Sequence, residues 1–294
     1  MTHPVLRYAA FTDPTARDSA ASGNPAGLVL DATTLDAAAM QAIAAEVGYA
    51  ETAFVTGVAL DGDPRRSRLR YFSPVAEVPF CGHATIAAAV ALAHRDGLGA
   101  FDFETPVGRV RIETSAEDGR VTASFTSVEP EVAPLADSVL DVLLSLLGID
   151  RSALHPDYPP RVAFAGNWHP VLVLAERAVF DGFVFDPAAM RELMDAQGWA
   201  GTVSVLRVVG EREFEARNLF PVGVITEDPA TGSAAASLGS YLRSLGLAPA
   251  LPGEPAARVT VHQGAHVGRP SLLTVDIPKR GGIVVSGEAA EIAA

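Results

Sequence analysis

Two short stretches of the sequence each place proton-transferring side chains at the expected entrance of a helix. PFCGHATIAAA (residues 79–89) has Cys-Gly-His directly before an alanine-rich segment, and EDPATGSAAAS (residues 227–237) has Asp-Pro-Ala-Thr-Gly-Ser before another. The N-terminus of a helix carries partial positive charge and backbone N–H groups that have no partner within the helix. Such an end can bind a carboxylate or stabilise negative charge that develops during a reaction.

The residue types at these entrances suggest acid–base chemistry on a small substrate. His83 and Asp228 can exchange protons, and small residues just inside each helix, such as Ala84 and Gly232, let a ligand approach the backbone. Ser233 adds a hydroxyl donor, as do the two threonines, Thr85 and Thr231. The two stretches are therefore predicted to form two halves of one active site.

Each candidate residue also has a purely structural interpretation. Asp228-Pro229 could be an ordinary N-cap followed by proline at the first helical position. His83 could be a buried ring with satisfied hydrogen bonds, and Cys81 a small buried residue. Glu51, in GYAETAF, could be a solvated charge at a strand end. The catalytic interpretation is favoured because these residues occur together in a repeated frame.

Sequence motifs for cofactors and metals are absent. The chain has no phosphate loop, no Gly-x-Gly-x-x-Gly after a strand, no HExxH and no Gly-x-Ser-x-Gly elbow. Its single cysteine excludes a multi-cysteine metal site. His262 and His266 are four residues apart, but the residues around them suggest a loop, which is a weak metal signal. We therefore expect neither a metal nor a cofactor.

Composition limits the other classes of function. Of 294 residues, 49% are hydrophobic and 19% are charged, which favours a packed core over disorder. The net charge of −13 disfavours nucleic acid and anionic lipid as partners. No secretory signal is visible, and the most apolar stretches (84–93 and 139–149) are about half of the ~20 residues that a membrane span needs. A cytoplasmic protein is expected.

The elements that must position these motifs are mostly consecutive strands with a few helices. In the first half, strands are expected at 5–11, 23–30, 51–55, 68–72, 101–114 and 120–126, and helices at 35–48 and 84–96. A linker-like, proline-rich stretch follows at 128–134. In the second half, helices are expected at 136–147, 186–199 and 233–245, and strands at 161–165, 170–175, 203–209, 214–220, 258–264, 271–278 and 281–292. This order favours an α+β class.

The two halves of the chain look like an internal repeat. RLRYFSPVAEVPFCGHATIAAAVAL and FEARNLFPVGVITEDPATGSAAASL both have a strand ending in Phe, then a proline, a loop, Ala-Thr and an alanine-rich helix. Aligning the Ala-Thr pairs places Thr85 opposite Thr231, and Gly82 opposite Asp228. Two related domains, each with one such helix, are predicted.

Five ordered stretches give the chain a family resemblance. GNPAGLVL, ETAFV, FSPVAEVPFCGHAT, EDPATGSAAA and HQGAHVGRPSLL, spread over residues 23–273, resemble the PhzF-like (phenazine biosynthesis-like) proteins, relatives of diaminopimelate epimerase and proline racemase. The resemblance implies a mixed α/β (α+β) fold of two pseudo-symmetric domains, each with a sheet curled around a central helix. It implies domains at 1–128 and 129–281, with the last strand, 282–294, returning to the first domain.

The resemblance also implies an activity. The related epimerases use two cysteines, which this chain cannot do. In the PhzF-like branch a glutamate in the ETAF-type strand transfers the proton, which implies Glu51 here, with His83 and Asp228 as further polar groups. The substrate-binding positions implied or expected are Gly82, Gly232, Ser233, Thr231 and Asn24. The enzyme would be a cofactor-independent, homodimeric isomerase acting on a small carboxylate-bearing metabolite. One alternative is an amino-acid epimerase or racemase with Asp228 or Cys81 as the second base. The other is a non-catalytic protein that binds small carboxylates.

Overall fold

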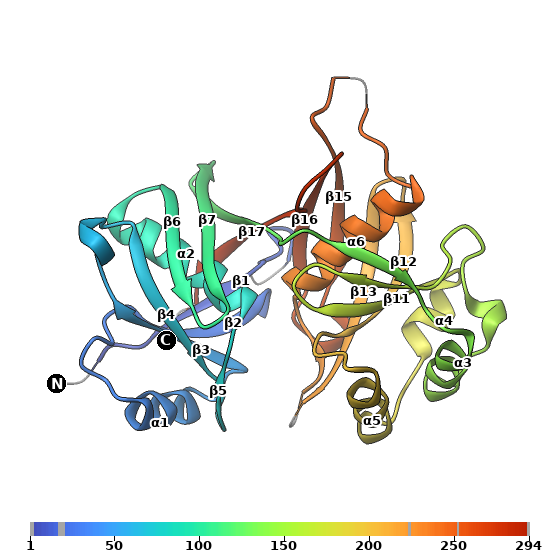
Figure 1. The fold of residues 1–294 in the computed structure, drawn as a ribbon, viewed down its shortest axis with the longest axis horizontal. Coiled ribbons are helices and arrows are strands. Elements are labelled where there is room, and N and C mark those ends of the chain that lie inside the picture. Colours follow the sequence, from blue (N-terminus) through green and yellow to red (C-terminus); the bar gives the residue numbers. More distant parts are fainter. Residues whose placement is uncertain (1–2, 17–20, 223–224, 252, 293–294) are drawn as a thin grey trace. The chain divides into compact units, whose positions relative to one another are not determined.

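The computed structural model describes residues 3–16, 21–222, 225–251 and 253–292 (Figure 1). The chain divides into two compact units, one formed by residues 1–126 with 286–294 and the other by residues 127–285. Among the described residues, no helix is both long enough and apolar enough to cross a membrane.

Strands of the first unit pair in a closed ring. β1 (Leu6–Ala10) is antiparallel to β2 (Asn24–Val29), β2 is parallel to β3 (Glu51–Gly57), β3 is antiparallel to β4 (Arg66–Phe72), and β4 is parallel to β6 (Gly99–Thr105). Antiparallel pairs continue through β7 (Gly108–Glu117) and β8 (Arg120–Thr126), and β17 (Val284–Glu291) pairs with both β8 and β1. The short strand β5 (Glu77–Val78) pairs with β4.

The helix α2 (Gly82–Asp96) packs against strands all around this ring. Residues 83 to 93 of the helix are all buried, and it contacts β1, β2, β3, β7 and β8. A helix that is apolar on every side belongs in a core, and its many alanines let the strands approach closely. Outside the ring, α1 (Ala37–Val47) covers β3 and β4 with Met40 and Ala44, which pack with Phe54 and Phe72.

The second unit repeats the strand pairing of the first. β10 (Arg161–Phe164) is antiparallel to β11 (Trp168–Leu174), β11 is parallel to β12 (Val203–Gly210), β12 is antiparallel to β13 (Glu213–Val222), β13 is parallel to β15 (Ala256–Gln263), and β15 is antiparallel to β16 (Ser271–Pro278). The short strand β14 (Ile225–Asp228) pairs with β13, as β5 does with β4. The mixed α/β fold of two pseudo-symmetric halves is confirmed by this repeated topology.

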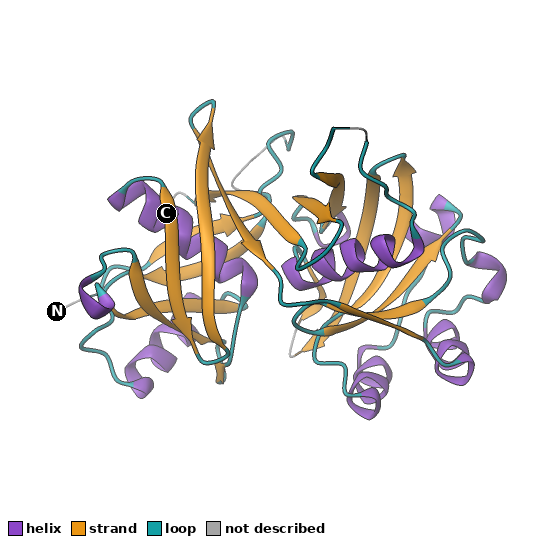
Figure 2. Ribbon diagram, turned by 45° about the horizontal axis from the view of Figure 1, so that its top comes forward, coloured by secondary structure: helices purple, strands orange, loops and turns teal. Residues whose placement is uncertain are grey.

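Helices lie on both faces of the second sheet (Figure 2). α6 (Gly232–Leu245) packs against β9, β10, β11 and β16. It approaches closely, because a Cβ atom on Gly239 would lie 2.7 Å from a methyl carbon of Ile283. α3 (Asp137–Leu146), α4 (Arg177–Gly182) and α5 (Pro187–Gln197) bury a separate apolar core with Leu172, Val205 and Leu219. Short 3₁₀ turns occur at Leu60–Gly62, Arg151–Ala153 and Ala265–Val267.

Several sequence expectations about elements are corrected by the structure. The stretch expected to be a linker, 128–134, contains the strand β9 (Glu131–Pro134), which pairs with β10. Its proline lies at a strand end, where a missing N–H donor is tolerated. His262 lies in β15 opposite Leu272, which agrees with the strand expected at 258–264 and not with the loop suggested by the residues around the two histidines. His266 is in a 3₁₀ turn, where Nε2 lies 3.2 Å from Asp181.

Candidate active site

Three reactive side chains meet at the entrance of α2. Glu51 is the first residue of β3, Cys81 is the N-cap of α2, and His83 is the second residue of that helix. The Cys81 thiol donates a hydrogen bond to Oε2 of Glu51, with 3.5 Å between sulfur and oxygen. The same oxygen lies 3.5 Å from Nε2 of His83, and the sulfur lies 3.4 Å from Nδ1. The predicted residues Glu51 and His83 are thus brought together, with Cys81 between them.

His83 is a neutral ring held by the strand β2. Burial lowers its pKa to about 4, so its contact with Glu51 is not an ion pair near pH 7. Its hydrogen bond with the backbone of Pro25 must use the carbonyl group, since proline has no N–H, and the ring therefore donates. Nδ1 also lies 3.1 Å from Nδ2 of Asn24. Asn24, expected to bind substrate, thus contacts a candidate catalytic residue.

Thr85 does not act at the helix entrance as expected. Its hydroxyl donates to the carbonyl of Cys81 over 2.7 Å and lies 2.7 Å from the hydroxyl of Tyr71. The side chain is fully enclosed, with 1% of its surface exposed. Thr85 therefore fixes the first turn of α2 and the position of Cys81.

A second cluster lies at the entrance of α6. The hydroxyl of Thr231, the N-cap residue, donates to Oδ2 of Asp228 over 2.6 Å. Gln263 donates to the carbonyl of Asp228 over 2.6 Å and to the hydroxyl of Thr231 over 3.0 Å, and its Oε1 accepts from the Thr231 N–H over 3.2 Å. Asp228 ends β14, three residues before the N-cap, so the interpretation of Asp228-Pro229 as an ordinary N-cap is wrong.

Ser233, the second residue of α6, is held by a buried histidine. Nε2 of His169 lies 3.0 Å from Oγ of Ser233, while the N–H of Thr202 donates to Nδ1 over 3.0 Å. Nδ1 is also 3.0 Å from the carbonyl and hydroxyl oxygens of Thr202, but that hydroxyl donates to Asn218. Because Nδ1 accepts from the Thr202 N–H, Nε2 carries the proton and donates to Ser233. Burial lowers the pKa of His169 to about 4, which keeps the ring neutral.

Sequence reasoning missed His169, Thr202, Asn218 and Gln263. His169 and Asn218 lie in strands and Thr202 lies directly before β12; none of them belongs to a local catalytic pattern, and their partners are far away in the sequence. Gln263 could have been found, because it lies in the HQG segment of a stretch that carries the family resemblance.

Strand register shows which positions correspond between the two units. Phe72 pairs with Thr52 and Glu77, and Leu219 pairs in the same way with Val203 and Glu227. The Arg70–Glu77 and Arg217–Glu227 ion pairs occupy matching places in this frame. Glu51, which precedes Thr52, therefore corresponds to Thr202, which precedes Val203.

The helix entrances give a corresponding match, which corrects the alignment on Ala-Thr. The N-caps are Cys81 and Thr231, so Gly82 corresponds to Gly232 and His83 to Ser233. Thr231 is opposite Cys81 and not Thr85, because Leu219 lies eight residues before its partner Glu227, whereas Phe72 lies five residues before Glu77. The first unit thus has glutamate and cysteine where the second has threonines.

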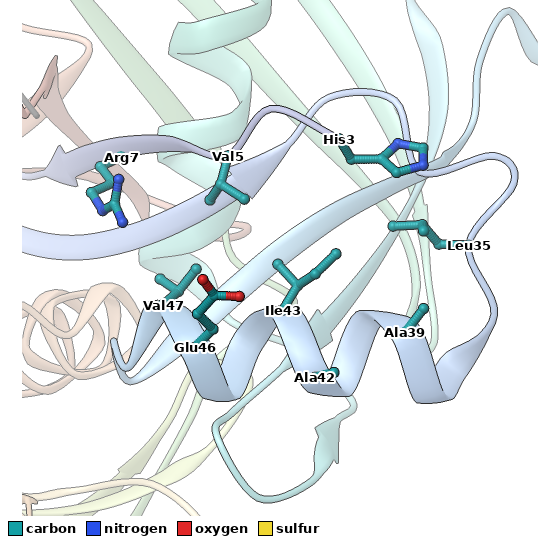
Figure 3. A pocket seen from close by; sticks show the side chains of 9 residues that line it. All are labelled: His3, Val5, Arg7, Leu35, Ala39, Ala42, Ile43, Glu46 and Val47. Carbon is teal, nitrogen blue, oxygen red and sulfur yellow. The ribbon is translucent and has the colours of Figure 1, made fainter. Parts of the chain in front are cut away.

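A groove on the outer surface of the first unit contains none of these residues. It lies between α1 and β1, has a volume of about 520 Å³, and is lined by apolar side chains with His3, Arg7 and Glu46 (Figure 3). Its residues include no arrangement of nucleophile and base. The groove is therefore separate from the cluster of Glu51, Cys81 and His83 at the α2 entrance.

Two topologically equivalent halves and acid–base groups at a helix entrance define an isomerase of the epimerase-like fold. The chain belongs to the phenazine biosynthesis-like protein family, whose family model matches residues 8–294. An uncharacterised isomerase from Deinococcus radiodurans is 34% identical over 287 residues, which cover 95% of this chain and 89% of the relative. A trans-2,3-dihydro-3-hydroxyanthranilate isomerase from Pseudomonas chlororaphis is 32% identical and matches 85% of this chain and 84% of that protein.

Solved structures agree with this assignment. A predicted epimerase from Pseudomonas aeruginosa superposes with a TM-score of 0.82 at 26% identity, covering 99% of this chain and 98% of that chain. A probable proline racemase from Agrobacterium radiobacter shares the fold, with a TM-score of 0.60 at 12% identity, covering 97% of this chain and 90% of that one.

Proposed function

We propose that the chain is a cofactor-independent isomerase that moves a proton between two carbons of a small carboxylate-bearing metabolite, with Glu51 as acid and base. The observation that carries this proposal is the position of the Glu51 carboxylate at the α2 entrance, 3.5 Å from both the Cys81 thiol and Nε2 of His83. With 18% of its side chain exposed, Glu51 is enclosed yet open to a ligand. A positioned carboxylate of this kind suits general acid–base catalysis.

In this mechanism the protein stabilises a carbanion-like state. Glu51 removes a proton from a carbon next to an activating group, and the resulting charge spreads into the substrate. The backbone N–H groups of Gly82 in α2 and Gly232 in α6, which have no partner in the helical hydrogen-bond ladder, are proposed to donate hydrogen bonds to the negative charge on the substrate. Each well-placed donor is worth about 3–4 kcal/mol. Glu51, now protonated, returns the proton to a second carbon, directly or through His83.

The two units supply different chemistry in this proposal. Thr202 corresponds to Glu51, and its hydroxyl donates to Asn218, so it is not a base near neutral pH. This supports a shift of one proton by one base over inversion by two matched bases. Asp228, oriented by Thr231, is proposed to bind a polar or cationic group of the substrate, and Ser233 to bind its carboxylate. Asn24 is proposed to orient His83.

A relative suggests the substrate class. The Pseudomonas chlororaphis protein is named for trans-2,3-dihydro-3-hydroxyanthranilate. We propose a substrate of the same chemical kind, a carboxylate conjugated with an enamine or diene, in which removal of a C–H proton gives a delocalised anion.

The test is hydrogen exchange at carbon. The protein is incubated in D₂O with trans-2,3-dihydro-3-hydroxyanthranilate, proline and hydroxyproline, and NMR follows deuterium uptake and new isomers. We expect deuterium uptake at a new carbon. Glu51→Gln should lose this uptake, and the control Glu117→Gln, which changes an exposed residue, should keep it. Uptake only at the original stereocentre would instead support an epimerase. Wild-type turnover by Glu51→Gln would exclude Glu51 as the acid–base group.

We also propose that the enzyme works in the cytoplasm as a homodimer and needs no cofactor. Activity is then expected to survive exhaustive dialysis against a chelator. Sedimentation velocity is expected to show a species of twice the 30.6 kDa chain mass.

A further inference from the structure

Strand register matches Ala26 of the first unit with His169 of the second. Ala26 lies opposite Glu51 in the parallel pair of β2 and β3. The register of the parallel pair of β11 and β12 places His169 beside Thr202, whose N–H donates to Nδ1 of the histidine ring. Because Thr202 corresponds to Glu51, His169 corresponds to Ala26.

The same frame matches Asn167 with Asn24, since each asparagine lies two residues before the matched position. The residues just before them agree, because Gly23 and Gly166 both have positive φ, of 72° and 113°. Asn24 is buried, and its Nδ2 lies 3.1 Å from Nδ1 of His83, the second residue of α2. Asn167 directly precedes β11 and is half-buried. The correspondence therefore places Asn167 near the second residue of α6.

The side chain of Asn167 makes no hydrogen bond with another residue in the described part of the chain. The pairing of β10 with β11 continues to this residue, whose carbonyl accepts from the Ala165 N–H over 3.4 Å, so its side chain lies on the same sheet face as that of His169. His169 reaches Ser233, the second residue of α6. The serine side chain is much shorter than the imidazole of His83 and does not engage the asparagine as His83 does. Asn167 therefore offers its amide to a ligand at the α6 entrance.

The hydrogen bond from His169 determines how Ser233 can bind a ligand. Nε2 of His169 donates to Oγ of Ser233 over 3.0 Å, so the hydroxyl oxygen already accepts and its own hydrogen must point elsewhere. None of the residues that the structure describes accepts that hydrogen, and Ser233 is half-buried. The hydroxyl therefore offers a donor, which selects a ligand group that accepts hydrogen bonds.

We propose that Asn167 and Ser233 together bind the carboxylate of the substrate, and that Asn167 is a specificity-determining residue of the isomerase. This assignment deepens the proposed function and rests on it. The Nδ2 amide of Asn167 donates to one carboxylate oxygen and the Ser233 hydroxyl to the other. A hydrogen bond to a charged group is stronger than one between neutral groups. The site should therefore prefer an ionised acid to the corresponding carboxamide.

Calorimetric titration of the full-length protein with anthranilate and with its neutral analogue anthranilamide is the test. Both probes are planar, and they differ only in carboxylate against carboxamide. The wild type should bind anthranilate at least about fivefold more tightly, the difference expected between charged and neutral hydrogen bonds. If the wild type bound anthranilate no more tightly than anthranilamide, the proposal would be overturned.

Variants of the two donors assign the preference to these residues. Asn167→Asp keeps the size of the side chain but replaces the donor with a negative charge, so it should weaken anthranilate binding by about tenfold or more and anthranilamide binding by less than about threefold. Ser233→Ala should also weaken the binding of anthranilate more than that of anthranilamide. The control Gln197→Glu makes the same change of charge at an exposed residue of α5 and should bind both probes as the wild type does. Circular dichroism confirms that each variant folds. An undiminished preference for the acid in Asn167→Asp would overturn the role of Asn167.

Calorimetry and deuterium exchange separate this proposal from the proposed function, because binding is measured without turnover. A wild type that exchanges no deuterium, together with a loss of acid preference in Asn167→Asp, would sink the isomerase proposal alone. An active wild type whose Asn167→Asp and Ser233→Ala variants both keep the preference for anthranilate would sink the carboxylate assignment alone.

Discussion

The hydroxyl of Thr231 donates a hydrogen bond to the carboxylate of Asp228 over 2.6 Å. Thr231 is the N-cap of α6, so the carboxylate is fixed to the entrance of that helix although it belongs to a strand. Gln263 holds the backbone of both residues. The orientation of Asp228 therefore depends on a side chain that performs no proton transfer itself.

Thr231→Val should reduce kcat/KM by about 10–100-fold. Without the hydrogen bond the Asp228 carboxylate can shift, and a displacement of about 1 Å in a substrate-binding group has effects of that size. Thr231→Ser keeps the hydroxyl and should stay within about threefold of the wild type. Steady-state kinetics on the substrate found by deuterium exchange makes the comparison. Equal losses in the two variants would show that the methyl group matters and the hydrogen bond does not.

Replacing His169 should destabilise the second unit. His169→Phe removes the acceptor of the buried Thr202 N–H, and an unsatisfied buried donor costs about 1–3 kcal/mol. Urea unfolding followed by tryptophan fluorescence is suitable, because Trp168 and Trp199, the two tryptophans of the chain, both lie in this unit. The control His262→Phe changes a half-exposed strand residue and should shift the unfolding free energy by less than about 0.5 kcal/mol. A loss of unfolding free energy in His169→Phe as small as that in His262→Phe would contradict this account.

Stability should fall as the pH drops from about 6.5 to 4. Burial lowers the pKa of His83 and of His169 to about 4, whereas unfolding restores the ordinary value of 6.5, so the unfolded chain binds protons that the folded chain excludes. The stabilisation is complete above about pH 6.5 and is lost as pH falls through the folded pKa, by up to roughly 3 kcal/mol for each ring. The hydrogen bonds from Arg70 lower the pKa of the Glu77 carboxyl from its usual value.

The measurement is the unfolding free energy at pH 7 and at pH 5 for the wild type, His83→Phe and His169→Phe. Each variant should show a smaller difference between the two pH values than the wild type does. The same difference in all three proteins would mean that the two rings do not resist protonation.

The corresponding ion pairs of the two units should contribute differently to the free energy of unfolding. Arg217 and Glu227 are both 9% exposed, and removing one partner of a buried pair costs about 3–5 kcal/mol. Arg70 and Glu77 occupy the corresponding positions but are 30% and 37% exposed, so their pair is worth no more than about 1 kcal/mol. Denaturation of Arg217→Met and Arg70→Met, followed by circular dichroism, compares them. Equal costs would refute the role given to burial.

Local sequence signals predicted the elements that depend on local contacts. Asp186 caps α5 by accepting hydrogen bonds from Ala188 and Ala189, and Gly48 ends α1 in the left-handed conformation; both are local signals of helix ends, and helices were expected at 186–199 and 35–48. Cys81 and His83 are separated by one residue, so their position at one helix entrance could be anticipated, whereas Glu51 was assigned from the family resemblance. The roles assigned to these residues remain proposals.

Contacts between distant residues were not predictable in the same way. The His169–Ser233 hydrogen bond joins a strand to a helix entrance, and nothing near either residue signals the other. The repeat was recognised but misaligned, because the Ala-Thr pair lies at different positions relative to the two helices. Thr85 is within α2, four residues after its N-cap Cys81, whereas Thr231 is itself the N-cap of α6. Strand register, which sequence similarity does not reveal, was needed to correct it.

The ring of the first unit is completed by β17, whose pairing with β1 joins residues from opposite ends of the chain: Tyr8 with Glu291, and the N–H of Ile292 with the carbonyl of Arg7. During synthesis, the first 126 residues leave the ribosome long before this strand is made. Until then β1 and β8 each present an unpaired edge, which is a template for association with other chains. The N-terminal unit can therefore close its ring only after β17 has been synthesised, and a nascent chain stalled before β17 would be a natural target for chaperones.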